Sequence, residues 1–209
     1  MSPTNFGPAY RIKTARLLIR CWDPSDAVLY KTAVDENIQH LKPWLSWAAK
    51  EPEELEKKVQ LLRKFRGEFD LDVDFYYGIF NQEETYVVGG TGLHTRAGPE
   101  SRQIGYWIHK RFTNQGFATE ISSALTKVAF EIECAERVEI FVHPDNLFSA
   151  AIPKKIGFSH EATLRERLRL SDGNLADAMV WTMFKSDYPA SNAAKTDIEA
   201  YNAFGKRIL

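Results

Sequence analysis

The sequence predicts one α+β domain. Three observations favour it. The 209 residues are 44% apolar and 26% charged, which is typical of a globular protein with one buried core. Alternating, β-rich runs and amphipathic helical periods follow one another along the chain. Turn residues separate them in the order strand, helix, helix, three strands, helix, strand, helix, two strands, so we expect seven strands.

The N-terminal third is predicted to contain one strand and two helices. Residues 16–22 alternate in a β-rich run and form the strand. Residues 23–26 (Asp-Pro-Ser-Asp) then start a helix, because they supply a capping oxygen, a tolerated proline and a first-turn carboxylate. An irregular aromatic segment at residues 41–47 precedes a long amphipathic helix, which we expect to end near Gly67.

The middle of the chain is predicted to be a three-stranded antiparallel meander followed by a helix. Residues 75–80 and 86–95 are joined by a polar hairpin turn, and residues 103–108 form the third strand. A polar segment ending at Gly116 leads into a helix of about four turns, because apolar residues recur there with helical spacing.

The C-terminal third predicts a strand, a short helix and a hairpin. These elements occupy residues 137–142, 146–156 and 159–184, and Gly157 ends the helix. We therefore divide the chain into an N-terminal arm (1–11), the folded domain (12–188) and a polar C-terminal tail (189–209).

Charge and cysteine content exclude several classes of protein. The 27 Lys and Arg residues balance 28 Asp and Glu residues, which argues against a nucleic-acid or anionic-membrane partner. Cys21 and Cys134 have neither disulfide-framework nor zinc-ligand spacing, so no metal site is expected. The chain shows no signal peptide and no apolar run of about 20 residues, so we expect a cytoplasmic protein.

The segment from Thr113 to Thr119 is a candidate phosphate-binding loop. A helix start carries unpaired N–H groups and a partial positive charge, and Gly116 lets a ligand approach the backbone closely. A loop of this kind is also a common plain connection. The sequence lacks the G-x-x-x-x-G-K-[ST] and G-x-G-x-x-G patterns, which argues against a nucleotide kinase or a dehydrogenase.

A second constellation follows one helix and one strand later. Asn146 is a good helix cap, Ser149 falls in the first turn, and Gly157-Phe158 ends the element. Each residue has an ordinary structural explanation, as a cap or a first-turn serine. Their spacing relative to one another is what suggests a functional site.

Taken together, these segments resemble the GNAT superfamily of N-acetyltransferases, and within it the RimJ/RimL-like branch of ribosomal-protein N-terminal acetyltransferases. The resemblance covers about residues 12–188. Four blocks match in order: Thr14–Arg20 (family pattern T-x-R-L-x-L-R), Pro43–Trp47 (aromatic loop), Ile104–Glu120 (Q/R-x-x-G-x-G/A) and Asn146–Phe158 (N-x-x-S...K-x-G-F).

The resemblance implies an α/β sandwich with a mixed, mostly antiparallel seven-stranded sheet that helices flank. The fourth and fifth strands of this sheet would splay apart and hold acetyl-CoA. The pantetheine arm would bond to backbone near Trp107, Ile108 and His109, with Asn146 close by. The pyrophosphate would lie on main-chain amides of the candidate loop. These loop residues are Asn114, Gln115, Gly116, Phe117, Ala118 and Thr119.

Three positions depart from the family pattern. Thr113 replaces the leading Gln or Arg, and Asn114 replaces a frequent glycine, which could restrict the turn. Pro153 occupies the position where many relatives carry a tyrosine that protonates the departing thiolate.

Acetyl transfer to an amine needs a proton acceptor for the amine and a proton donor for the thiolate. The resemblance makes Ser149 the candidate for the thiolate contact. Glu139 is the candidate base, because it is out of phase with its apolar strand neighbours; its alternative role is an exposed partner of a nearby arginine.

Other candidates for the acceptor side remain open. His94 and His143 are alternative bases, and Gln103 stands near a position where some relatives place a carboxylate. The carboxylate that the ribosomal enzymes use falls at Leu168 here. Trp44 and Trp47 are candidate walls of the acceptor site, with a satellite hydrophobic cluster as the alternative.

We therefore expect an N-acetyltransferase that uses acetyl-CoA and no metal, acting on a small or amino acid-like amine. One alternative is acetylation of a protein N-terminus; another, from a different class, is a non-catalytic acyl-CoA-binding module. The expected partner is a small-molecule amine or a peptide N-terminus. The oligomeric state is left open, with a homodimer as one option.

Overall fold

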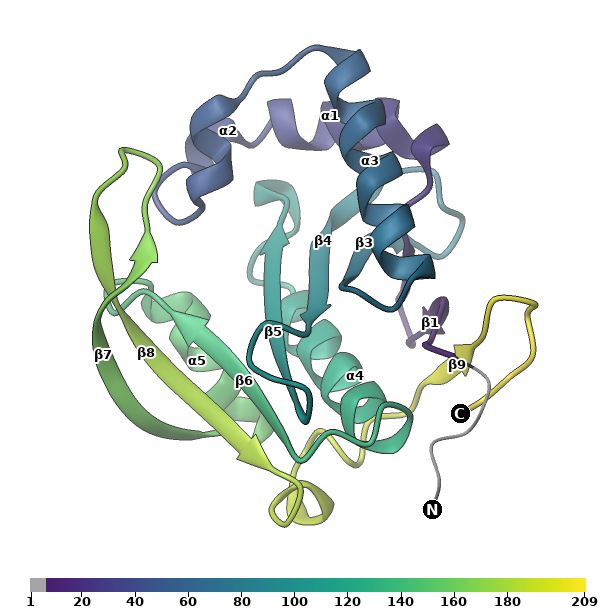
Figure 1. The fold of residues 1–209 in the computed structure, drawn as a ribbon, viewed down its shortest axis with the longest axis vertical. Coiled ribbons are helices and arrows are strands. Elements are labelled where there is room, and N and C mark those ends of the chain that lie inside the picture. The colour runs from purple at the N-terminus through teal and green to yellow at the C-terminus, as the bar shows by residue number, and fades with distance from the viewer. Residues whose placement is uncertain (1–6) are drawn as a thin grey trace.

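A computed structural model describes residues 7–209, which form a nine-stranded sheet flanked by helices (Figure 1). The strands are β1 (Arg11–Lys13), β2 (Leu17–Cys21), β3 (Phe75–Asn81), β4 (Val87–His94), β5 (Ser101–Ile108), β6 (Arg137–Val142), β7 (Ser159–Arg169), β8 (Leu175–Phe184) and β9 (Glu199–Tyr201). The helices are α1 (Ala27–Asp35), α2 (Ile38–Leu41), α3 (Leu55–Asp70), α4 (Phe117–Glu131) and α5 (Leu147–Ile156), with 3-10 turns η1 (Pro24–Asp26), η2 (Ser46–Lys50), η3 (Lys110–Phe112) and η4 (Tyr188–Ala190).

The sheet is antiparallel except at one central junction. Its strand order is β7-β8-β6-β5-β4-β3-β2-β1-β9, and among the described strands only β5 and β6 pair in parallel. A parallel neighbour needs a crossover connection, and α4 supplies it. The front end of α4 therefore lies beside the carboxyl end of β5.

Two hydrophobic clusters cover the two faces of the sheet. Along β2, Leu17 and Ile19 belong to the cluster that α4 and α5 complete, and Leu18 belongs to the cluster beneath α1 and α3. Successive strand residues point to opposite faces, so this alternation assigns each cluster to its own face. Trp22 and Tyr30 fill the second cluster with edge-on ring contacts.

The predicted fold class is confirmed, and all seven predicted strands are present. The described residues add β1 and β9, which pair with each other at the sheet edge, so the segment predicted as a polar tail contributes a strand. Three-residue strands are too short to show a period in the sequence. Residues 1–6 of the predicted N-terminal arm lie outside the described part of the chain.

Helix α3 continues through Gly67 to Asp70, past its predicted end. Phe69 in this extra turn is fully buried, and the burial of its ring outweighs the low helix propensity of Gly67. Lys58 on the same helix is also fully buried and forms ion pairs with Glu51 and Glu53, so it fixes the segment that enters the helix.

No helix within residues 7–209 has the length and apolar character needed to span a membrane.

Candidate active site where β5 and β6 separate

The parallel pairing of β5 and β6, which are the fourth and fifth of the seven predicted strands, ends before the carboxyl ends of both strands. Ser101–Ile104 pairs with Arg137–Ile140, but β5 continues to Ile108 and β6 to Val142 with no further paired positions. The two strands diverge toward their carboxyl ends in Figure 1. Backbone N–H and C=O groups along this opening are therefore free to bind a ligand.

The backbone of β5 determines which groups face the opening. The His109 N–H donates to the Val88 carbonyl at 2.9 Å, so it points toward β4. In an antiparallel pair, the backbone polar groups of successive residues point alternately toward and away from the partner strand. Trp107, two residues before His109, therefore also directs its N–H and C=O groups toward β4. Tyr106 and Ile108 direct theirs into the opening. Of the three residues predicted to offer backbone to the pantetheine arm, Ile108 therefore has the suitable orientation.

The loop before α4 has the shape of an anion cradle. Gly116 has a φ of 82° and Asn114 a φ of 61°, both in the left-handed region. Asparagine adopts this region more readily than other non-glycine residues, so its replacement of the family's glycine keeps the turn. Within the described chain, the backbone amides of residues 114–119 donate no hydrogen bond to protein.

Two residues just before β2, Thr14 and Arg16, hold this loop in place. The Thr14 hydroxyl donates to Glu120 in the first turn of α4 at 2.6 Å, and the Arg16 Nε donates to the same carboxylate at 2.8 Å. Arg16 also donates to the Gln115 carbonyl at 2.9 Å and stacks over Phe117 at 4.3 Å. This role was not predicted from the sequence, although Thr14, Arg16 and Glu120 all lie inside the matched blocks.

These features fit acetyl-CoA. Free amides and a helix N-terminus suit a diphosphate, because such a site needs no dedicated basic side chain. The opening between β5 and β6 suits an extended arm that bonds to free backbone, as an added strand does. The residues present therefore meet the requirements of this co-substrate.

Ser149 lies on the far side of the opening, at the start of α5. The Asn146 side chain caps this helix by accepting from the Ser149 N–H at 3.1 Å. Pro153 has no N–H, so it cannot donate to the Ser149 carbonyl as a helix residue normally would. The Tyr106 hydroxyl takes its place, 3.3 Å from this carbonyl and 2.9 Å from the Ser149 Oγ.

Tyr106 is a functional candidate that was not predicted from the sequence. It crosses the opening from β5 to α5, and burial raises the pKa of its hydroxyl to about 12. The hydroxyl is thus protonated at neutral pH and can donate. No sequence period could indicate this contact, because Tyr106 and Ser149 meet only in the folded sheet.

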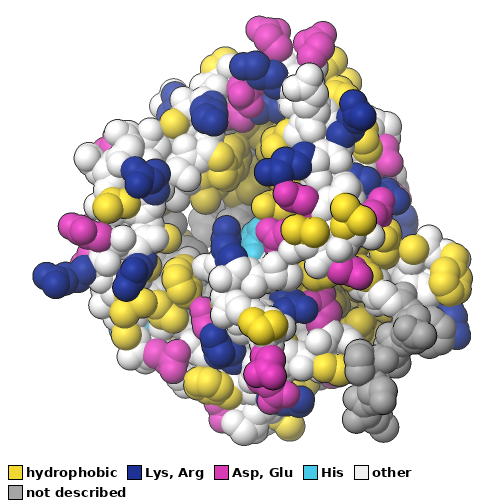
Figure 2. Space-filling view, viewed as in Figure 1, with side chains coloured by type: hydrophobic (Ala, Val, Ile, Leu, Met, Phe, Trp, Pro, Cys, Tyr) yellow, Lys and Arg dark blue, Asp and Glu magenta, His cyan; other side chains and the backbone are white. Residues whose placement is uncertain are grey.

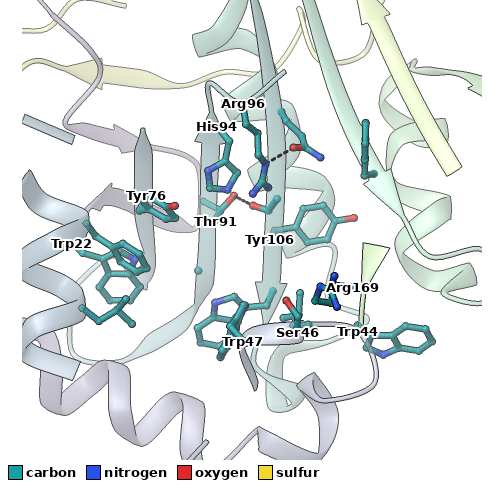
Figure 3. A pocket seen from close by; sticks show the side chains of 18 of the residues that line it. Trp22, Trp44, Ser46, Trp47, Tyr76, Thr91, His94, Arg96, Tyr106 and Arg169 are labelled. Carbon is teal, nitrogen blue, oxygen red and sulfur yellow. Dashed lines mark hydrogen bonds between the residues drawn. The ribbon is translucent and has the colours of Figure 1, made fainter. Parts of the chain in front are cut away.

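A cavity of about 1180 Å³ lies on the α1–α3 side of the opening. Its walls are rich in aromatic side chains, including the two predicted walls, Trp44 and Trp47 (Figure 3). The Trp44 ring contacts His143 beyond β6, with centroids 5.6 Å apart, and Trp47 contacts Trp107 at 6.3 Å. The aromatic loop, which lies between α2 and α3, therefore reaches across the cavity to the end of β6.

His94 lies over the floor of this cavity. Gly92 and Gly105 have no side chains beneath the ring, and a Cβ on Gly105 would stand 3.4 Å from the His94 Nε2. The His94 Nδ1 lies 2.9 Å from Asp74 at the start of β3. Burial alone would raise the pKa of Asp74, but its interactions with His94, together with hydrogen bonds from Tyr76 and the Thr95 N–H, outweigh burial and lower this pKa.

An ionised Asp74 accepts a hydrogen bond, so the His94 Nδ1 is the donor in this contact, and Nε2 is then the acceptor atom of the neutral imidazole. Glu139 also faces the cavity, but its carboxylate accepts from the Arg137 Nε at 2.7 Å. Leu168 lines the cavity where the ribosomal enzymes would have a carboxylate. Within residues 7–209, no cluster of three His, Cys, Asp or Glu side chains is arranged to hold a metal.

Known proteins share this sequence pattern and fold. The family model described as "Acetyltransferase (GNAT) domain" matches residues 16–159, about two thirds of the chain. A protein of Bacillus subtilis (strain 168), named "Putative ribosomal N-acetyltransferase YdaF", is 25% identical over 177 residues, which cover 82% of this chain and 93% of that protein.

Solved structures agree in fold. Mycobacterium smegmatis RimJ in complex with CoA-disulfide superposes with a TM-score of 0.74 at 22% identity, covering 93% of each chain. The RimL ribosomal L7/L12 α-N-protein acetyltransferase in complex with coenzyme A gives a TM-score of 0.73 at 20% identity, covering 82% of this chain and 95% of that one. Given the match to the family model, this chain belongs to the GNAT acetyltransferase family, as an N-acetyltransferase that takes its acetyl group from acetyl-CoA.

Proposed function

We propose that this enzyme acetylates the primary amine of a small or amino acid-like acceptor. The observation that carries the proposal is the aromatic-lined cavity, which adjoins the opening between β5 and β6 and has an oriented imidazole on its floor. Aromatic walls with a few placed polar groups are typical of small-molecule sites.

The amine must lose a proton when it attacks. Acetyl-CoA supplies the thioester carbonyl, and the backbone N–H of Ile108 is placed to polarise it. The His94 Nε2 accepts the amine proton, directly or through a water, while Asp74 holds the ring and stabilises the charge that forms. Glu139 is the alternative base, but it would first have to leave Arg137.

The departing sulfur must gain a proton. We assign this donation to Ser149, with Tyr106 as the group that orients the serine hydroxyl and replenishes its proton. In this scheme Tyr106 takes the role of the tyrosine that many relatives carry in the helix equivalent to α5, at the position that Pro153 occupies here.

A peptide N-terminus is the second candidate acceptor. Among the similar proteins, YdaF is named as a ribosomal N-acetyltransferase and RimL as a ribosomal L7/L12 α-N-protein acetyltransferase. A cavity of this size, flanked by the exposed β7–β8 hairpin, has room for the first residues of a chain.

Acetyl-transfer assays separate the two acceptors. We expect thiol release from acetyl-CoA to depend on an added amine, and free amino acid amides to react at least as fast as peptides that begin with the same residue. Faster transfer to peptides would favour the second candidate. Binding of acetyl-CoA with no transfer to any amine would contradict both and support a non-catalytic module.

The identity of the base can be tested by pH dependence. We expect His94→Gln to lower kcat/KM by about 100-fold, because general bases contribute about 10² to 10⁴, and to make the fall in rate at acid pH less steep, because only protonation of the amine itself then remains. Asp74→Asn should lower the rate less and keep the steeper fall. Glu139→Gln is the matched control and should retain the wild-type profile; a less steep fall in this variant instead would assign the base to Glu139.

Asp74 stays ionised across the pH range of these assays. A carboxylate with a lowered pKa contributes stability above its unfolded-state pKa of about 3.9, and this contribution is lost only as pH falls through its lower folded-state pKa. Asp74 therefore holds His94 throughout the range from about pH 5 to 9.

A further inference from the structure

The walls of the acceptor cavity carry more positive than negative charge. Six cationic side chains line it, against three carboxylates. The cations are Lys50, Lys57, Lys64, Arg96, Arg167 and Arg169, and the carboxylates are Glu51, Glu53 and Glu139. The whole chain has a formal charge of −1, so this excess is local.

The three carboxylates are paired mostly from behind the cavity wall. Lys58, which does not line the cavity, is paired with both Glu51 and Glu53. Arg137, also outside the lining, is paired with Glu139. These two cations offset two of the three negative charges, and Lys57 of the lining lies 3.9 Å from Glu53, so the other lining cations are not offset by the carboxylates of the wall.

Four of the lining cations have no carboxylate within ion-pair distance among the described residues. These are Lys50, Arg96, Arg167 and Arg169. The Arg96 Nε donates to the Gln103 amide oxygen, and Arg169 donates to the Gly173 carbonyl at 3.1 Å. Both partners are neutral, so both guanidinium charges remain uncompensated.

These cations come from separate elements that surround one hollow. Lys50 ends η2, Arg96 follows β4, and Arg167 and Arg169 lie on β7. Basic side chains surround the hollow in Figure 2, and Figure 3 shows Arg96 and Arg169 on opposite sides of Tyr106. A ligand in the cavity would meet positive charge from more than one direction.

We propose that the acceptor amine also carries an anionic group, a carboxylate or a phosphate, which Arg96, Arg167 and Arg169 bind while the aromatic walls pack the acceptor body. This inference rests on the proposed function. Arginine suits the role because its planar fork matches carboxylate and phosphate oxygens with paired hydrogen bonds. The low dielectric of an aromatic-lined cavity strengthens such bonds.

Three amines of matched shape test the proposal. Tyrosine amide, 4-carboxyphenylalanine amide and O-phosphotyrosine amide share one α-amine and differ in the charge of the far end of the ring. We expect kcat/KM for one or both anionic amines to exceed that for tyrosine amide by about 10-fold or more, mainly through KM. The preferred anion then distinguishes a carboxylate from a phosphate.

Paired variants locate the effect. The double variant Arg167→Gln, Arg169→Gln should reduce the preference for the anionic amine by about 10-fold, where the preference is the ratio of its kcat/KM to that of tyrosine amide measured with the same variant. Arg165→Gln is the control, because Arg165 lies on the same strand and does not line the cavity. Circular dichroism checks that the exposed hairpin still folds.

The outcomes separate this inference from the proposed function. Equal kcat/KM for all three amines, or a preference that survives the double variant, would overturn the anionic acceptor and leave the N-acetyltransferase intact. Absence of transfer to every amine in this panel and the previous one, while acetyl-CoA binds, would overturn both.

Discussion

Replacing Gly116 by valine is expected to weaken acetyl-CoA binding by about 100-fold or more. Gly116 has a φ of 82°, a region that β-branched residues almost never adopt, so the variant must strain or reshape the loop. The new side chain would also project toward Arg16, whose Nη2 lies 3.6 Å from the Cβ position. Titration calorimetry with acetyl-CoA measures the effect directly.

Two controls separate strain from loss of the binding loop. Gly173 has a φ of 89° with open space around its Cβ position, in the distant hairpin turn, so Gly173→Val creates similar backbone strain away from the loop. It should bind acetyl-CoA normally. Asn114→Gly should also bind normally, because glycine adopts the φ of 61° freely. Normal binding by Gly116→Val would show that the loop does not hold the diphosphate.

The second large effect is expected in turnover. Ser149→Ala should lower kcat by about 100-fold and leave the Kd for acetyl-CoA unchanged, because we propose that the hydroxyl acts on the departing sulfur and not on the diphosphate. Tyr106→Phe should also lower kcat, by a smaller factor, since it removes the partner of the Ser149 Oγ and keeps the ring. Rapid-quench measurements of acetyl transfer follow the chemical step in both variants.

Control measurements make this prediction decisive. Both variants should unfold at temperatures close to that of the wild-type protein and titrate with acetyl-CoA as it does. Full turnover by Ser149→Ala would exclude the serine as proton donor. Unchanged turnover by Tyr106→Phe would show that Tyr106 has only a structural role, as the donor to the Ser149 carbonyl in place of the N–H that Pro153 lacks.

Much of the fold could be predicted, because long elements carry a period. The alternation along residues 16–22 and the apolar stripe of α4 each indicate an element and its buried face. The three-residue strands β1 and β9 carry no such signal. Their pairing depends on where residues 11–13 and 199–201 meet in space.

The candidate site was predictable where its residues are close in sequence. The phosphate loop is one short segment, so its glycine and its helix start could be recognised together. His94 and Asp74 are 20 residues apart and meet only because Phe75 pairs with Leu93 in the β3–β4 hairpin. Glu139 has both features that the sequence suggests for it: it lines the cavity, and it pairs with a nearby arginine, which the structure identifies as Arg137.

Pro153 shows how one residue can be interpreted in two ways. In the sequence it appears only as the loss of a tyrosine. In the folded chain its missing N–H leaves the Ser149 carbonyl without a helical donor, and Tyr106 from β5 supplies one. The consequence of the substitution depends on a strand more than 40 residues earlier, which no local pattern reveals.

A crystal structure of the complex with acetyl-CoA tests the central claim most directly. We expect the diphosphate on the backbone amides of residues 114–119 and the pantetheine arm between β5 and β6, bonded to the backbone of Tyr106 and Ile108, with the sulfur near Ser149. A diphosphate bound elsewhere, or β5 and β6 paired along their full length with the arm excluded, would contradict this account.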